Sequence, residues 1–247
     1  MPRRGRIKSE TGIYHVMLRG INQQVIFEDD EDYEKMLQTL SDVKAISNFE
    51  MYAYCLMPNH CHFLLKDGHE SLEQIFRRIG SRYVYWYNLK YKRVGHLFQD
   101  RYKRETIENE KQLLAVLRYI HQNPIKGGLC SQLSDYTWSS YNEYLGKQKI
   151  VDTKDIFEII ERKAFEDFSK SESNEKVLDD EPRGFRVSDT EAKARITKIS
   201  GCDSTTAFQK LELSVKRKYL KEFKDAGISI RQINRLTGIS KGIVERA

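Results

Sequence analysis

The sequence predicts an α+β fold, an antiparallel sheet with packed helices, followed by an all-α C-terminal domain with a helix-turn-helix. Strand-like and helix-like segments follow one another in the order β-α-β-β-α-β-α in the first half of the chain, which is typical of this class. Residues 169–188, "SKSESNEKVLDDEPRGFRVS", are polar and acidic, and we interpret them as a linker. Beyond them the patterns are helical only. We therefore expect a domain at 1–150, a helix and polar linker at 151–187, and a helical domain at 188–247.

The first four segments are a strand, a helix and two strands that form a hairpin. "GIYHVMLRG" (12–20) has strand character and ends at a glycine. Residues 29–47 begin with acids, which favour a helix N-terminus, and their apolar residues recur at helical spacing. Two strand-like runs follow at 49–57 and 60–66, separated by the turn dipeptide Pro58-Asn59.

The next three segments continue the alternation. A long helix is expected from Ser71 to about Lys92, because Ser71 with Glu73 and Gln74 makes a plausible N-terminal cap. Residues 101–108 have the character of another strand. Residues 109–123 predict a helix that stops at Pro124, because proline lacks the backbone N–H that an inner helical position needs.

The C-terminal region predicts helices alone. Residues 188–201 predict one helix, and residues 204–227 predict a second. In "ISIRQINRLTGISKGIVERA" we expect Ser229 and Ser240 to cap two short helices, with Gly238 in the turn between them. This pattern favours a helix-turn-helix, whose second helix enters a DNA major groove, over a plain helical hairpin.

Charge is distributed unevenly along the chain. The formal net charge is +6 and the pI about 9.0, yet nine Lys and Arg and a single acid lie between Arg77 and Arg104. Tyrosines and a tryptophan are interleaved with these bases, an arrangement that suits unstacked bases on a phosphate backbone. A solvated helix face is the alternative. The residues that we expect to contact DNA are Arg3, Arg4, Arg6, Arg77, Arg82, Lys90, Lys92, Arg93, Arg101, Lys103, Arg104, Ser240 and Lys241.

The cysteines and the hydropathy exclude several classes of protein. None of the four cysteines forms a C-x-x-C pair, so neither a zinc ribbon nor a disulfide framework is indicated. No apolar run approaches transmembrane length. We expect a cytoplasmic, nucleoid-associated protein with reduced thiols and no membrane contact.

Two histidines in "HCHFLL" are the first candidates for chemistry. Alternate residues of a strand share a face, so His60 and His62 should point the same way while Cys61 points to the opposite side. Two imidazoles on one face can bind a single divalent metal ion. For an arbitrary H-x-H pair, two separately satisfied histidines are the commoner outcome.

The helix at 109–123 carries a second pair. Tyr119 and Asn123 are four residues apart and so share a face of the helix. The Asn123 carbonyl oxygen can be a third metal ligand, and a tyrosine can be a nucleophile. From the residues alone, the structural interpretation is favoured: Tyr119 packs, and Asn123 caps the helix end.

A resemblance to a known family favours the functional interpretation of these residues instead. The chain resembles the single-tyrosine HUH transposases, and most closely the REP-associated tyrosine transposases, in "YHVMLRGINQQVIFEDDEDYEKML", "YCLMPNHCHFLL", "GHLFQDRYKRETIENEKQLLAVLRYIHQNPIKGGL" and "YTWSSYNEYL". The resemblance covers roughly residues 13–145. The family motif, two histidines around a bulky hydrophobic residue and a helical tyrosine with an amide four residues later, matches His60-Cys61-His62, Tyr119 and Asn123. Cys61 is a mild departure, and related insertion-sequence transposases carry Gln at the position of Asn123.

The resemblance implies a fold and a mechanism. It implies a ferredoxin-like HUH nuclease domain in which His60, His62 and Asn123 bind Mg²⁺ or Mn²⁺. It also implies that Tyr119 attacks a phosphate of single-stranded or hairpin DNA to give a 5′-phosphotyrosine and a free 3′-hydroxyl, and that the protein acts as a monomer or homodimer. One alternative is a non-catalytic DNA-binding regulator that uses the helix-turn-helix. A weaker one is a zinc-dependent hydrolase that uses the two histidines.

Overall fold

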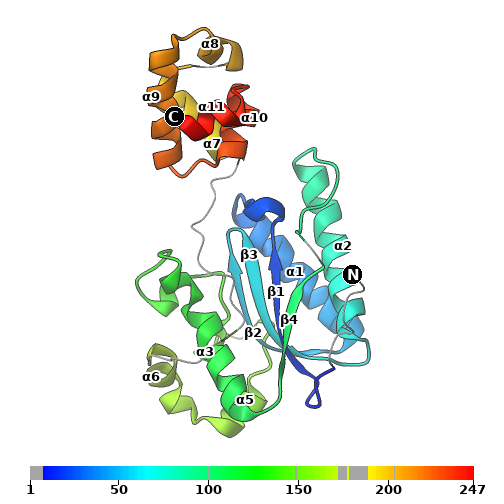
Figure 1. Cartoon of the computed structure of the whole chain (residues 1–247). Helices are drawn as coiled ribbons and strands as arrows, with labels where there is room; N and C mark the ends of the chain where they lie inside the picture. Colours follow the sequence, from blue (N-terminus) through cyan, green and yellow to red (C-terminus); the bar gives the residue numbers. More distant parts are fainter. Residues whose placement is uncertain (1–7, 100, 148, 172–176, 178–188, 203) are drawn as a thin grey trace. The chain divides into compact units, whose positions relative to one another are not determined.

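The computed structural model describes residues 8–99, 101–147, 149–171, 177, 189–202 and 204–247 (Figure 1). The expected DNA contacts Arg3, Arg4 and Arg6 lie outside this part of the chain. Contacts divide the chain into two compact units, residues 1–22 with 26–182 and residues 23–25 with 183–247. Each unit has its own hydrophobic core.

A four-stranded antiparallel sheet is the centre of the first unit. Its strands are β1 (Ile13–Arg19), β2 (Glu50–Met57), β3 (His60–Lys66) and β4 (Lys103–Ile107), in the order β2-β3-β1-β4. Each neighbouring pair is antiparallel. The α+β class and the antiparallel sheet are confirmed. Because β1 lies between β3 and β4, residues far apart in the sequence meet on its two sides.

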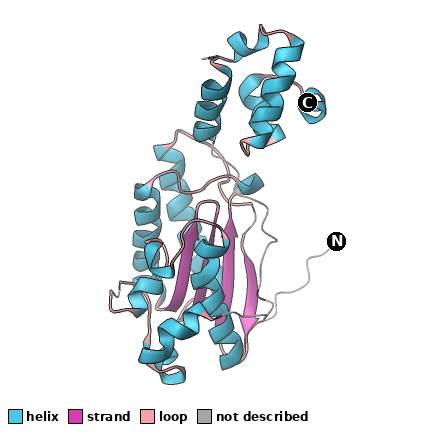
Figure 2. Ribbon diagram, turned by 90° about the vertical axis from the view of Figure 1, so that its left-hand side faces the viewer, coloured by secondary structure: helices cyan, strands magenta, loops and turns pink. Residues whose placement is uncertain are grey.

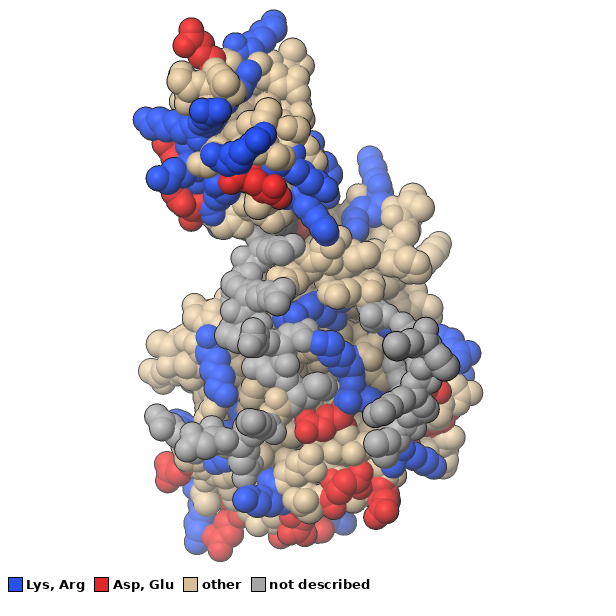
Figure 3. Space-filling view, viewed as in Figure 1, with Lys and Arg blue, Asp and Glu red and all other residues tan. Residues whose placement is uncertain are grey.

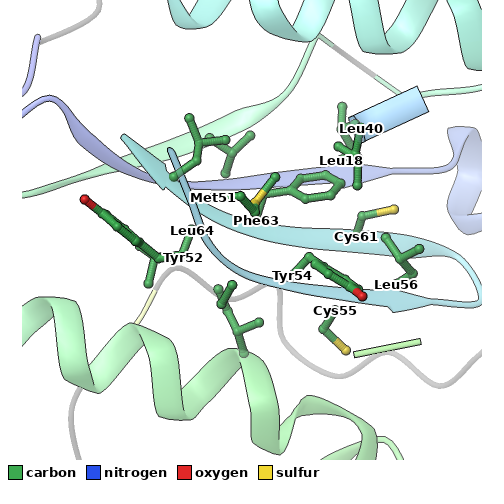
Figure 4. Close-up of a cluster of buried hydrophobic side chains, with 14 of the residues drawn as sticks. Leu18, Leu40, Met51, Tyr52, Tyr54, Cys55, Leu56, Cys61, Phe63 and Leu64 are labelled. Carbon is green, nitrogen blue, oxygen red and sulfur yellow. The ribbon is translucent and has the colours of Figure 1, made fainter. Parts of the chain in front are cut away.

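Helices cover both faces of the sheet (Figures 1 and 2). Helices α1 (Asp30–Ser47) and α2 (Leu72–Lys90) cover one face, and α3 (Glu110–Lys126) covers the other. In Figure 4, Leu18 and Phe63 point toward Leu40 of α1, whereas Cys55 points to the opposite side.

Local signals in the sequence predict the start of α2 correctly but not the end of α3. The Ser71 side chain accepts a hydrogen bond from the Gln74 backbone N–H, and Gln74 reciprocates, so the predicted cap of α2 is confirmed. The prediction that Pro124 stops α3 is wrong, because the helix continues to Lys126. Pro124 lies in the last turn, and helical bonding resumes after it, because the Gly127 N–H bonds to the Asn123 carbonyl oxygen at 2.8 Å.

Short elements complete the first unit. They are η1 (Ile21–Gln23), η2 (Leu133–Asp135), α4 (Tyr141–Tyr144), α5 (Lys154–Ile159), η3 (Arg162–Ala164) and α6 (Phe165–Lys170). Ile156 and Phe165 are fully buried in the main core, and the Gln122 amide of α3 donates a hydrogen bond to the Ser169 carbonyl oxygen at 2.9 Å. Helices α5 and α6 thus pack onto the first unit, although the sequence analysis placed them in a separate segment.

The second unit is helical. It contains α7 (Asp189–Ser200), α8 (Thr205–Gln209), α9 (Leu213–Asp225), α10 (Ile230–Thr237) and α11 (Lys241–Arg246) around a core that includes Phe208 and Phe223. The single helix expected at 204–227 is wrong, because the chain breaks between α8 and α9. Ser229 caps α10 as expected, but Ser240 makes no capping hydrogen bond through its side chain. Gly238, at φ 70°, turns the chain between α10 and α11.

None of the described helices is both long enough and apolar enough to span a lipid bilayer.

Candidate functional site

Strand β3 places two imidazoles on the face of the sheet that α3 covers. The ring centroids of His60 and His62 are 5.0 Å apart, and the rings meet edge to face. His62 lies opposite Met17 of β1 and Cys55 of β2, and its side chain is fully buried. His60 is at the strand's start and is half-buried. The two histidines therefore share a face, as the alternation of a strand predicts.

Helix α3 brings the tyrosine to the same place. The Tyr119 ring centroid lies 5.6 Å from that of His62, again edge to face. Asn123 follows one turn later, and its amide nitrogen donates a hydrogen bond to the Tyr119 carbonyl oxygen at 3.1 Å. This bond leaves the Asn123 side-chain oxygen as the atom available to an ion. Both residues are 8% exposed, so the strand and the helix meet at the rim of the core.

A third histidine, His15, belongs to this cluster, and sequence reasoning missed it. His15 is fully buried on β1, with its Nε2 3.0 Å from Nδ1 of His62 and its ring centroid 5.2 Å from that of His62. Its Nδ1 lies 3.7 Å from a carboxylate oxygen of Glu105 on β4. The register pairs His15 with both Leu64 and Glu105 across the sheet. Only this register, which no local pattern reveals, brings the residues together.

The electrostatics of the cluster favour neutral imidazole at His62. Burial, then the nearby His60, His15 and Arg19, hold the pKa of His62 well below its ordinary value. The Nε2 atom of His62 is buried and has no hydrogen-bond partner among the described residues. At His60, Nδ1 lies 2.6 Å from the Asn59 side-chain oxygen, so Nδ1 is the donor and Nε2 keeps its lone pair. Both histidines thus offer Nε2 as a ligand atom.

A metal fits these residues as a partly open site. Among the described residues there is no group of three or more His, Cys, Asp and Glu placed to hold an ion by themselves. Two imidazoles and the Asn123 oxygen are the candidate ligands, and the uncommitted Nε2 of His62 is the observation that supports them. A set this small leaves positions for substrate oxygens, as catalytic sites do and structural sites do not.

The predicted DNA contacts on α2 are of two kinds. Arg77 and Arg82 are exposed and make no ion pair with described residues. Lys90 differs, because its ammonium group lies 2.7 to 2.9 Å from the carboxylates of Asp29, Glu31 and Asp32. Its charge is therefore neutralised by the protein's own acids rather than available to DNA.

The aromatic residues of α2 also divide. Tyr83 and Tyr87 are 0% and 2% exposed and belong to the core, while Tyr85 is 74% exposed. The guanidinium of Arg93 lies 5.5 Å from the Tyr87 ring centroid, and that of Arg104 lies 5.2 Å from the Tyr14 ring centroid. Of the interleaved tyrosines, Tyr85 therefore has the surface that base stacking requires.

The match to a known family covers the elements that build this cluster. Residues 8–123 match the family model described as transposase IS200 like. This segment belongs to that family. The match runs from just before β1 to Asn123, and so includes both the four strands and the part of α3 that carries Tyr119.

Individual relatives extend the match of the IS200-like segment. The chain is similar to the protein named REP-associated tyrosine transposase from Escherichia coli (strain K12), with 28% identity over 142 residues, 57% of this chain and 81% of the relative. It also resembles the solved structure of a REP-associated tyrosine transposase bound to a REP hairpin. That likeness has a TM-score of 0.54 and 17% identity, and it covers 72% of this chain and 100% of the other. At this identity it shows the fold.

Proposed function

We propose that this chain cleaves single-stranded DNA and transfers the strand through a covalent bond between Tyr119 and a 5′-phosphate. The observation that carries the proposal is the meeting of Tyr119 with His62 at 5.6 Å between ring centroids, because the two lie on separate elements. A phenol beside the uncommitted Nε2 of His62 is a potential nucleophile beside a potential metal ligand. Membership of the IS200-like family supports the same chemistry.

Each residue then has a defined role. His60, His62 and Asn123 hold a divalent ion, for which we propose Mg²⁺ or Mn²⁺, and the bound ion supplies positive charge against the phosphate oxygens. The Tyr119 oxygen attacks phosphorus and loses its proton. The bond to the 3′ oxygen breaks, and that oxygen leaves as a hydroxyl after gaining a proton. Because the phosphotyrosine keeps the ester linkage, another 3′-hydroxyl can reverse the step and join a new strand.

The substrate class follows from the exposed residues and from the related structure. Arg77 and Arg82, which make no ion pair with described residues, offer charge for a phosphate backbone, and Tyr85 offers a ring for an unpaired base. The related transposase structure contains a REP hairpin, and we propose hairpin-bearing single strands for this chain as well.

The test is a covalent adduct. A labelled single strand with a hairpin is incubated with the protein and Mg²⁺ or Mn²⁺, and denaturing electrophoresis separates a protein–DNA adduct. Tyr119→Phe should abolish the adduct, whereas Tyr85→Phe, which changes an exposed tyrosine of α2, should keep it. Chelation of the metal should remove the adduct from the native protein. An adduct formed by Tyr119→Phe would show that another residue is the nucleophile.

The second candidate function is a regulator that binds DNA without cleaving it, and the net charge of the C-terminal helices supports it. Residues 189–247 hold thirteen Lys and Arg against seven Asp and Glu, which equals the +6 of the whole chain. Figure 3 shows these basic side chains gathered over the C-terminal helices. With the turn at Gly238 between α10 and α11, this supports duplex binding by a helix-turn-helix. The same assay separates the candidates, because a regulator binds duplex DNA and forms no adduct with any metal.

A further inference from the structure

Three residues from three strands form a chain that leads from the candidate metal ligand to a carboxylate. His62 on β3, His15 on β1 and Glu105 on β4 lie on one face of the sheet, since His15 and Glu105 are direct register partners. The His62 Nδ1 to His15 Nε2 distance is 3.0 Å, and the His15 Nδ1 to Glu105 Oε2 distance is 3.7 Å. The first is a hydrogen bond, and the second is an electrostatic contact beyond hydrogen-bond length.

The carboxylate determines where the protons lie. An ionised carboxylate only accepts, so His15 is favoured with its proton on Nδ1, facing Glu105. Its Nε2 then carries the lone pair and must accept from His62. The His62 proton is therefore on Nδ1, and its Nε2 carries a lone pair. Each assignment leaves one buried ring N–H without a hydrogen bond, at His15 Nδ1 in the favoured one and at His62 Nε2 in the opposite one. The carboxylate decides between them, because the opposite assignment would direct the His15 lone pair at a negative charge 3.7 Å away.

We propose that His15 is a positioning residue, which holds His62 in the tautomer and orientation that present Nε2 to a metal ion. Metal-ligating histidines commonly donate their other ring nitrogen to a partner that fixes the ring in this way. Here the partner is a second imidazole, which Glu105 orients in turn. The two ring planes differ by 25° and the centroids are 5.2 Å apart, so the rings lie nearly edge to edge along this hydrogen bond. The part of this inference that concerns metal binding rests on the proposed function.

The first test needs no metal and no DNA. Long-range ¹H–¹⁵N correlation spectra of the labelled full chain assign the tautomer of each histidine. We expect His62 to be protonated on Nδ1 in the native protein. His15→Phe keeps an aromatic ring against His62 but removes the acceptor, and it should shift His62 toward the Nε2-protonated form. His15→Gln, whose side-chain oxygen can accept the same hydrogen bond, should restore the native spectrum.

The second test measures Mn²⁺ binding to the full chain by calorimetry. His15→Phe should weaken Mn²⁺ binding by about 10- to 100-fold, and His15→Gln should recover most of the loss. Met17→Leu is the matched control, because Met17 lies on the same strand and the same face and is buried without a polar group. It should leave both the tautomer and the affinity unchanged.

Either of two results overturns the proposal. One is a His62 that is protonated on Nε2 in the native protein, and the other is an unchanged tautomer and Mn²⁺ affinity in His15→Phe. A loss of Mn²⁺ binding that His15→Gln does not rescue would also count against positioning and would indicate a packing role. Failure of the proposed function has a different signature, a native protein that forms no adduct although its His62 spectrum is as expected.

Discussion

Strand β3 has fully buried side chains on both faces of the sheet, but the two faces are built from different chemistry. On β3, Cys61, Phe63 and Leu65 point toward α1 and α2, and all three are 0% exposed. His62 points toward α3 and is also 0% exposed. The apolar side chains are satisfied by packing alone, whereas His62 retains a ring nitrogen without a hydrogen bond among the described residues. Burial by itself therefore does not separate a core residue from a site residue. An unsatisfied ring nitrogen is a second observation, and it supports a site at His62 only together with the neighbouring His60 and Tyr119.

The helices that cover the two faces contact β3 at similar ring distances but through side chains of different chemistry. Phe76 of α2 meets Phe63 with 5.7 Å between ring centroids, and Tyr119 of α3 meets His62 with 5.6 Å. One contact joins two apolar rings, and the other joins a phenol to an imidazole. A single seven-residue strand thus provides stability on one side and the candidate chemistry on the other.

Substitutions at the neighbouring positions 62 and 63 of β3 should separate stability from cleavage, and we expect their effects to be the largest of those predicted here. Phe63→Ala should lower the free energy of unfolding by about 3–5 kcal/mol, because it leaves a cavity in the main core. His62→Gln should lower metal-dependent cleavage by about 1000-fold, since a metal ion contributes several kcal/mol to the transition state. Urea unfolding and adduct yield measure the two effects.

The contrast has a clear counter-result. Two results together would show that the two faces do not have separate roles. One is an equal loss of unfolding free energy in His62→Gln and Phe63→Ala, and the other is an equal loss of cleavage by the two variants in their folded states. Adduct yields are compared at a temperature where each variant is folded, as judged by circular dichroism, so that lost stability is not counted as lost chemistry.

The surface of α2 allows the same comparison with charged residues. Lys90→Met leaves the fully buried carboxylate of Asp32 without its ammonium partner, so it should cost about 1–3 kcal/mol of stability and leave DNA affinity unchanged. Arg82→Met should leave stability unchanged and lower the affinity for DNA. Loss of one phosphate contact should reduce the slope of log affinity against log salt by about 0.7 for a single strand. Fluorescence anisotropy with a labelled strand at several salt concentrations measures both variants.

A reduced salt slope in Lys90→Met, equal to that of Arg82→Met, would show that Lys90 leaves its three carboxylates when DNA binds. An unchanged slope in Arg82→Met would remove Arg82 from the DNA surface.

Local patterns predicted the elements well, because the relevant physics is local. The run at 60–66 alternates as a strand does, and β3 has those bounds. The cap of α2 depends on residues three apart, and it formed as expected. The pairing of Tyr119 with Asn123 on one helix face needed only the helical repeat.

Features that depend on long-range register or competing local forces were not predictable. His15 and Glu105 are ninety residues apart and meet only because β1 and β4 pair. The break between α8 and α9 contains neither glycine nor proline, so the helical spacing of the residues did not predict it. Lys90 looked like a DNA contact because its partners lie on α1, about sixty residues earlier in the chain.

The smallest effect concerns an exposed ion pair at the apolar side of the sheet. Glu70 accepts hydrogen bonds from Arg78 of α2, at 2.6 and 2.8 Å, and from Ser47 at the end of α1, at 2.6 Å. These bonds, Arg78 first, lower the pKa of Glu70 to about 2. Because the pKa is lower in the folded state, the pair stabilises the fold above the ordinary value of 4.5 and loses this effect as pH falls toward 2.

Arg78→Met should therefore lower the melting temperature slightly at pH 7 and flatten its decline between pH 4.5 and 2. Arg77→Met, one residue earlier, is the control, because Arg77 has no ion pair among the described residues and should leave the pH profile of stability as it is. DNA affinity should show the opposite pattern to stability. Arg77→Met should lower the affinity for DNA, and Arg78→Met should leave it unchanged. Equal pH profiles for Arg78→Met and the native protein would mean that solvent screening cancels the pair.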